Sequence, residues 1–182
     1  MKKIFFIIAL SLSATVFASD LSINVGHSGA PNGFADIASN EFKRLVEKRS
    51  NGRIKVSVFP SGQLGGEREL VEAAQLGTVD MAVVLAGILE SFEPKFGVLN
   101  LPYLFDNRQH VFKVFDGKVG RQLMDLLAKH NLKGYAFGEF GFRSMMIGPR
   151  AVYNASDVNG LKFRVPESDI YISMYKNLGA TP

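Results

Sequence analysis

The sequence contains no cysteine, and this absence excludes several classes of chemistry at once. Without cysteine there can be no disulfide framework, no thiol nucleophile and no cysteine-based zinc site. The three histidines, His27, His110 and His130, lack the i, i+4 spacing of a metal-binding helix, and no cluster of carboxylates accompanies them. We therefore expect neither a metal site nor a cofactor.

The sequence also lacks the run of about 20 apolar residues that a membrane-spanning helix needs. A shorter apolar run, Ile4–Leu12, follows Lys2 and Lys3 and precedes the triplet Val16-Phe17-Ala18. This layout is typical of a secretory signal peptide. We expect residues 1–18 to be removed by cleavage near Ala18, leaving a periplasmic protein that does not itself span the membrane.

The excess of positive charge is small, with 21 Lys and Arg against 17 Asp and Glu. Loss of the signal peptide would remove two lysines and no acid, leaving 19 basic against 17 acidic side chains, a net charge of +2. The remaining basic residues are interleaved with acids, as at 41–44 and 47–49, which is typical of a solvated helix face. Because a one-sided basic stripe is missing, we expect no nucleic-acid partner.

The first half of the chain alternates between strand and helix patterns. Its strands are β-branched or continuously apolar, and its helices carry apolar residues at helical spacing and end at Gly or Asn-Gly. The predicted elements are a strand at 21–26, a helix at 33–50, a strand at 54–59, a helix at 67–76 and a strand at 81–85. The last strand is apolar enough to be covered on both faces. This order is typical of an α/β fold with a mostly parallel sheet.

The second half is less regular. Helical spacing predicts helices at 108–115 and 118–129, and a last helix that begins near Ser168. One face of this last helix carries Tyr171, Met174, Tyr175 and Leu178. Further strands are predicted at 132–137, 143–147 and 162–165.

The segment Gly26-His27-Ser28-Gly29-Ala30 nearly copies the nucleophile elbow G-x-S-x-G between a strand and a helix. An exported serine hydrolase that uses Ser28 is therefore an alternative function. However, Ala30 replaces the final glycine, and Pro31-Asn32 delay the helix that an elbow enters at once. A turn that brings His27 close to a cleft fits the segment better.

Two arginines follow strand patterns near the end of the chain. Alternation places Phe163 and Val165 on one face of their strand and Arg164 on the other. Arg164 lies at the carboxyl end of that strand, where open α/β sheets bind ligands. Arg143 follows Gly141 in a similar position. A guanidinium can hold a carboxylate through two parallel hydrogen bonds, although spacing alone equally allows solvated arginines.

Six segments together resemble one protein family. In chain order they are residues 59–65 (FPSGQLG), 77–82 (GTVDMA), 101–105 (LPYLF), 141–143 (GFR), 157–166 (DVNGLKFRVP) and 178–182 (LGATP). In this order they resemble the periplasmic solute receptor of tripartite ATP-independent periplasmic (TRAP) transporters, of the dicarboxylate-receptor type. The resemblance extends from about residue 21 to residue 182.

The resemblance implies a two-lobed binding protein, not an enzyme, that closes around an organic acid such as a C4-dicarboxylate. It implies that Arg164 grips the ligand carboxylate and that Arg143 supports the same site. Apart from the resemblance, His27, in its turn near a cleft, and Phe142 are secondary candidates for ligand binding. The partner would be the membrane permease subunits of a TRAP transporter. A receptor-like domain that serves a sensor is a further alternative.

The resemblance also implies a longer chain than the one present. On this basis residues 19–136 form the first lobe, and residues 137–182 form only the start of the second, incomplete lobe. Because lobe closure requires both lobes, we expect the shortened chain to fold poorly and to bind weakly.

Overall fold

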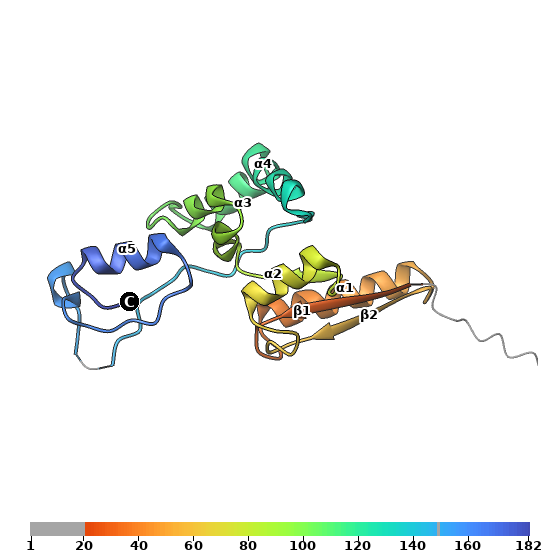
Figure 1. The fold of residues 1–182 in the computed structure, drawn as a ribbon, viewed down its shortest axis with the longest axis horizontal. Helices are drawn as coiled ribbons and strands as arrows, with labels where there is room; N and C mark the ends of the chain where they lie inside the picture. The colour runs from red at the N-terminus through yellow and green to blue at the C-terminus, as the bar shows by residue number, and fades with distance from the viewer. Residues whose placement is uncertain (1–20, 149) are drawn as a thin grey trace, which may run out of the picture.

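The computed structural model describes residues 21–148 and 150–182, so the expected signal peptide lies outside the described residues. The described part begins with a β-α-β-α-β unit. Its elements are β1 (Leu21–His27), α1 (Phe34–Arg49), β2 (Ile54–Phe59), α2 (Glu67–Leu76) and β3 (Met81–Val83). The strands form a parallel three-stranded sheet in the order β2-β1-β3, with the helices packed alongside it (Figure 1). This arrangement confirms the predicted α/β class with a parallel sheet.

The centre of the sheet is β1, which pairs with both other strands. Val25 is in register with Val58 of β2 and with Met81 of β3. Along β2 the side chains alternate as predicted, with Val56 buried and Lys55 exposed. The face of the sheet that carries Val25 and Val56 is therefore buried and apolar, and α1 packs against β2.

Helix α2 approaches β1 so closely that one strand position requires glycine. Leu70 of α2 is fully buried, and a Cβ added to Gly26 would lie only 2.5 Å from the Leu70 Cδ2 atom. The carboxyl end of β1 is further fixed because the backbone N–H of Gly62, in the loop before α2, donates to the carbonyl of His27 at 3.0 Å.

A group of short helices follows β3 and packs against α2. They are η1 (Ala86–Ser91), η2 (Pro94–Asn100), α3 (Arg108–Phe115), α4 (Lys118–Leu126) and η3 (Leu127–His130). A single apolar core joins them to α2 through the buried residues Val71, Leu89, Phe96, Leu123 and Leu127. In Figure 1, α3 and α4 lie on the side of α2 that faces away from the strands.

Glu93, between η1 and η2, is a carboxylate that is 98% buried in this helical group. It forms an ion pair with Lys129, and its Oε2 atom lies 3.2 Å from His130 Nε2. Its Oε1 atom accepts a hydrogen bond from the backbone N–H of Lys95 at 3.3 Å. The hydrogen bond from Lys129, followed by those from His130 and Lys95, lowers the pKa of Glu93 from 4.5 to about 2, although burial opposes this shift.

The C-terminal part of the chain contains little regular structure. It holds one short 3-10 helix, η4 (Ala155–Val158), and one α-helix, α5 (Asp169–Asn177). Lys162 and Thr181 form an isolated parallel bridge, in which the N–H of Phe163 donates to the Thr181 carbonyl at 2.8 Å. In Figure 1 this part lies at one end of the molecule, away from the sheet, and an extended segment connects it to α4 and η3.

The predicted strands at 132–137 and 143–147 are wrong, and the strand at 162–165 is reduced to the bridge at Lys162. A strand requires a hydrogen-bonding neighbour, and among the described residues the segment at Thr181 is the only one that supplies it here. The predicted strand at 81–85 ends at Val83 and is half-buried, because β3 lies at the sheet edge. The helix predicted at 118–129 changes to 3-10 geometry after Leu126.

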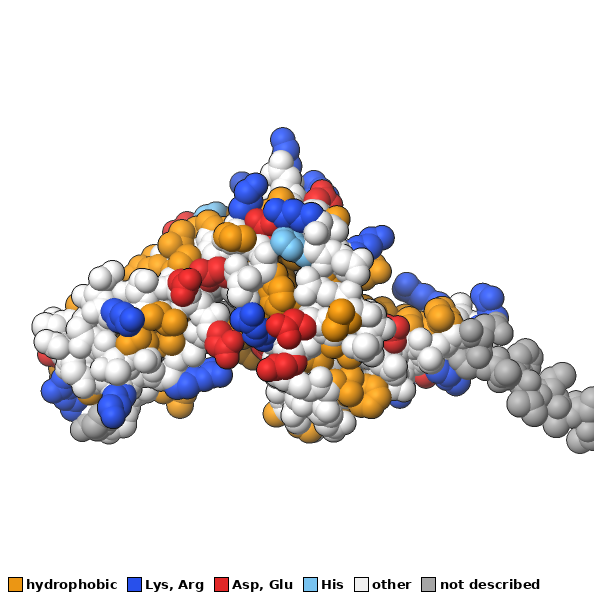
Figure 2. Space-filling view, in the orientation of Figure 1, with side chains coloured by type: hydrophobic (Ala, Val, Ile, Leu, Met, Phe, Trp, Pro, Cys, Tyr) orange, Lys and Arg blue, Asp and Glu red, His pale blue; other side chains and the backbone are white. Residues whose placement is uncertain are grey.

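The visible surface carries acidic and basic side chains in mixed groups, without a one-sided basic stripe (Figure 2). This distribution agrees with the interleaved charges of the sequence. Within residues 21–148 and 150–182, no helix is both long enough and apolar enough to cross a membrane.

We predict that Glu93→Gln destabilises the protein at neutral pH and that its effect disappears in acid. Because the folded-state pKa of Glu93 is lowered to about 2, its ion pair stabilises the fold above the ordinary pKa of 4.5. This contribution is lost as the pH falls from about 4.5 towards 2. Chemical denaturation of both proteins at several pH values measures the difference in the free energy of unfolding.

The control for this prediction is Glu41→Gln. Glu41 forms an ion pair with Arg44 on the exposed face of α1, where both side chains are more than half exposed. Such surface pairs contribute little to stability. A Glu93→Gln effect that is no larger than the Glu41→Gln effect, or that is the same at every pH, would contradict the prediction.

Candidate functional site

Arg164 lies on an extended segment whose side chains alternate as the sequence predicts. Phe163 and Val165 are half-buried, whereas Arg164 is exposed. The Phe163 ring lies against the Tyr175 ring of α5, with 4.6 Å between the ring centroids. Arg164 is therefore accessible to a ligand in solvent, and alternation predicts that it lies on the face opposite to Phe163.

Arg143 reaches the same helix from the irregular segment that precedes η4. Its Cζ atom lies 5.4 Å from the centroid of the Tyr171 ring, within the range of a cation–π interaction. Gly141, two residues earlier, has a φ of 110°, a conformation that glycine readily adopts. Both candidate arginines thus belong to segments that contact α5, on Tyr171 and Tyr175.

The N-terminus of α5 is attached to the helical group by a network of polar side chains, of which Asn100 and Ser168 are buried and Glu90 is half-buried. The Ser168 hydroxyl donates to Glu90 Oε2 at 2.5 Å, and Asn100 Nδ2 donates to the same oxygen at 2.8 Å and to Ser168 Oγ at 3.0 Å. Ser168 is also the N-cap of α5, because its Oγ accepts a long bond of 3.5 Å from the Tyr171 N–H. The network therefore fixes the start of the helix that both arginine segments contact.

The network allows no side chain at Gly87 of η1. Asn100 Nδ2 donates to the Gly87 carbonyl at 3.1 Å. A Cβ added to Gly87 would lie only 2.0 Å from Asn100 Oδ1. Asn100 can therefore hold its position only because residue 87 is glycine.

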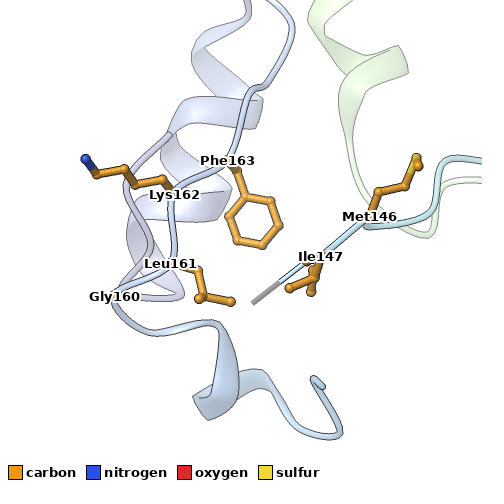
Figure 3. Close-up of a pocket in the computed structure, with 7 residues that line it drawn as sticks. Met146, Ile147, Gly160, Leu161, Lys162 and Phe163 are labelled. Atoms are coloured by element: carbon orange, nitrogen blue, oxygen red, sulfur yellow. The ribbon is translucent and has the colours of Figure 1, made fainter. Parts of the chain in front are cut away.

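A hollow of about 370 Å³ opens between residues 146–148 and residues 160–163, two segments that precede α5 in the chain. It is lined by Met146, Ile147, Gly148, Gly160, Leu161, Lys162 and Phe163. Figure 3 shows Leu161 and Phe163 facing Ile147 across the gap, whereas the Lys162 side chain points away. Neither Arg143 nor Arg164 lines this hollow, so it is separate from the candidate carboxylate site.

His27, a secondary candidate, is completely buried at the carboxyl end of β1. Its Nε2 atom lies 3.5 Å from Asp36 Oδ1, and its ring nitrogens make no hydrogen bond within the described residues. Asp36 in turn accepts bonds from the Asn32 N–H at 2.8 Å and from Asn40 Nδ2 at 2.9 Å. A ligand in solvent does not reach His27 in this arrangement, and its role in binding stays a prediction.

Phe142, the other secondary candidate, is exposed and lies beside Arg143 in the sequence. Its role in binding also stays a prediction.

The hydrolase alternative finds no support in the geometry around Ser28. The Ser28 hydroxyl donates to Glu67 Oε1 at 2.9 Å, while the His27 imidazole is buried next to Asp36. The Ser-His arrangement that a nucleophile elbow implies needs a histidine base within hydrogen-bond reach of the serine hydroxyl. Within the described residues, no group of three or more His, Cys, Asp or Glu side chains could hold a metal ion.

Comparison with protein families decides between a binding protein and an enzyme. Residues 25–182 match the family described as bacterial extracellular solute-binding protein, family 7. The chain belongs to this family. Family membership places it among solute-binding proteins rather than enzymes, which confirms the resemblance that the six sequence segments indicate.

Individual family members are similar over most of the chain. The C4-dicarboxylate-binding protein DctB of Bacillus subtilis is 38% identical over 86% of this chain and 45% of its own length. A TRAP periplasmic solute-binding protein from Polaromonas, solved with D-erythronate, is 35% identical, with a TM-score of 0.85 over 89% of this chain and 54% of that one. The corresponding protein from Sulfurospirillum deleyianum, solved with succinate, is 29% identical, with a TM-score of 0.86 over 91% and 53%. The chain spans about half the length of the curated relatives it matches.

The sequence indicates both arginines as candidates, and their role stays a prediction, but it gives no indication of the network that holds α5. Glu90, Asn100 and Ser168 are separated by up to 78 residues, and no local pattern connects them. The tyrosines of α5 were visible as an apolar stripe, but the stripe alone did not indicate contact with Arg143. The only available signal was the N-cap preference of Ser168.

We predict that Ser168→Ala loosens α5. The substitution removes both the helix cap and the hydrogen bond to Glu90, and it should cost about 1–3 kcal/mol of local stability. Hydrogen exchange of the α5 amides measures this loss. Ser173→Ala, at an exposed position on the same helix, is the matched control. Equal exchange rates in the two variants would show that the network does not hold the helix.

Proposed function

We propose that this chain is part of a TRAP-type solute receptor that captures a small organic acid outside the cytoplasm. The observation that carries the proposal is the family match over residues 25–182. The structural similarity to a receptor solved with succinate and to another solved with D-erythronate supports it. These two ligands share a carboxylate and differ in their hydroxyl groups, so the carboxylate is the feature that we assign to this receptor.

Arg164 is our primary candidate for the group that binds the carboxylate. Its side chain is exposed, while the neighbouring Phe163 is fixed against Tyr175. A guanidinium presents two parallel N–H donors to a carboxylate, and a lysine ammonium cannot reproduce this geometry. Arg143 supplies a second positive charge from the neighbouring segment, and we propose a supporting role for it.

We further propose that the receptor works in the periplasm and delivers its ligand to TRAP permease subunits in the membrane. The N-terminal sequence pattern of a secretory signal peptide supports export. Permease genes next to the gene for this chain would favour transport. A sensor kinase gene in the absence of permease genes would favour the alternative role in sensing.

We predict that Arg164→Lys weakens the binding of succinate and D-erythronate by about tenfold or more, because the two parallel hydrogen bonds are lost. NMR titration of the isotope-labelled chain up to high millimolar ligand concentrations measures affinity even when binding is weak. Erythritol, which has no carboxylate, serves as the control ligand and should cause no saturable shifts.

Lys162→Gln is the matched control variant. It removes a positive charge two residues from Arg164, from a side chain that points away from the adjoining hollow (Figure 3). We expect its affinity to equal that of the unmodified chain. Unchanged affinity in Arg164→Lys would remove Arg164 from the site. Equal losses in both variants would indicate only a general electrostatic attraction.

A further inference from the structure

The two segments that carry the candidate arginines contact two tyrosines of α5 that are one helical turn apart. Arg143 lies over Tyr171, and Phe163, the neighbour of Arg164, lies against Tyr175. We propose that Tyr171 and Tyr175 form an aromatic platform that positions both arginines for the ligand. This inference rests on the proposed function and adds two positioning residues to it.

The first half of the platform acts directly on a guanidinium. Arg143 belongs to a segment without strand pairing, so the backbone alone does not fix its side chain. Its Cζ atom lies 5.4 Å from the Tyr171 ring centroid, so a cation–π interaction holds the guanidinium against the face of that ring. Without this ring the long arginine side chain would sample many rotamers, and ligand binding would have to restrict it again.

The second half acts through the backbone. The rings of Phe163 and Tyr175 lie 4.6 Å apart and are inclined by 37°. Because side chains alternate along an extended segment, fixing Phe163 against α5 directs Arg164 to the opposite side. The bridge between Lys162 and Thr181 holds the same segment one residue before Phe163.

The two halves of the platform are close enough to influence each other electrostatically. Burial raises the pKa of the Tyr175 hydroxyl, Tyr171 raises it further, and Arg143 opposes the shift. Tyr171 itself is in the first turn of α5, and its backbone N–H donates to the Ser168 cap that is bonded to Glu90. The platform is therefore attached to the helical group, and its contacts restrict the positions of both arginine segments.

The first experiment needs no ligand. A proton above an aromatic face is shifted upfield by the ring current, so the Nε–H resonance of Arg143 should be shifted upfield in the NMR spectrum of the chain. We expect Tyr171→Leu to abolish this shift and Tyr171→Phe to retain it, because phenylalanine keeps the ring. A Nε–H resonance that is the same in the chain and in Tyr171→Leu would overturn the inference.

The second experiment measures the effect on succinate affinity. We expect Tyr171→Leu to weaken binding by about two- to fivefold, the range of an exposed cation–π contact, and Tyr171→Phe to restore it. In an Arg143→Ala background, Tyr171→Leu should have no further effect. We expect Tyr175→Leu to weaken binding only while Arg164 is present. Tyr153→Leu, at a highly exposed tyrosine outside α5, is the control and should leave affinity unchanged.

The outcomes separate the platform from the proposed function. Equal losses from Tyr171→Leu with and without Arg143 would mean that the tyrosine acts only on folding, and this would overturn the inference. A ring-current shift in a chain that binds no carboxylate would support the platform and contradict the proposed function.

Discussion

The carboxylate of Glu90 is half-buried, and it therefore needs hydrogen-bond donors from the protein in place of water. It receives them from Asn100 and from Ser168, which is distant in sequence and starts α5. Removing either donor would leave a partly buried charge less satisfied, so the three side chains favour a single arrangement. Because Ser168 caps α5, this network attaches the start of the helix that carries Tyr171 and Tyr175 to the helical group. The segments of both candidate arginines contact this helix.

The elements of the first half could be predicted from the sequence because their signals are local. The Asn-Gly pair after α1 and the glycine after α2 mark where these helices end. The alternation along β2 indicates which of its faces is buried. None of these signals depends on a distant partner. The predicted strands at 132–137 and 143–147 failed for the opposite reason. Their apolar composition satisfies the strand pattern, but a strand also needs a neighbour, and no short-range signal specifies one. The same limit applies to β3, whose apolar run does not reveal that it lies at the sheet edge.

In the candidate site, too, the features set by local patterns could be predicted and those set by distant contacts could not. The exposure of Arg164 and the partial burial of Phe163 follow from alternation, which is local and was predicted. The contact between Arg143 and Tyr171 joins residues 28 positions apart, and it depends on the path of an irregular segment that no periodic pattern describes. Family resemblance assigned a role to the arginines, but it gave no information about the side chains that hold them. Those side chains became visible only in three dimensions.

Gly87 shows how far the requirements of the site extend into the rest of the molecule. It carries no side chain, and it is remote in sequence from both arginines. Any larger residue would nevertheless collide with Asn100, because a Cβ there would meet Oδ1 at 2.0 Å. Displacing Asn100 would take a donor from Glu90 and release the cap of α5. A substitution at Gly87 can therefore disturb the start of α5 although residue 87 itself contacts neither arginine segment.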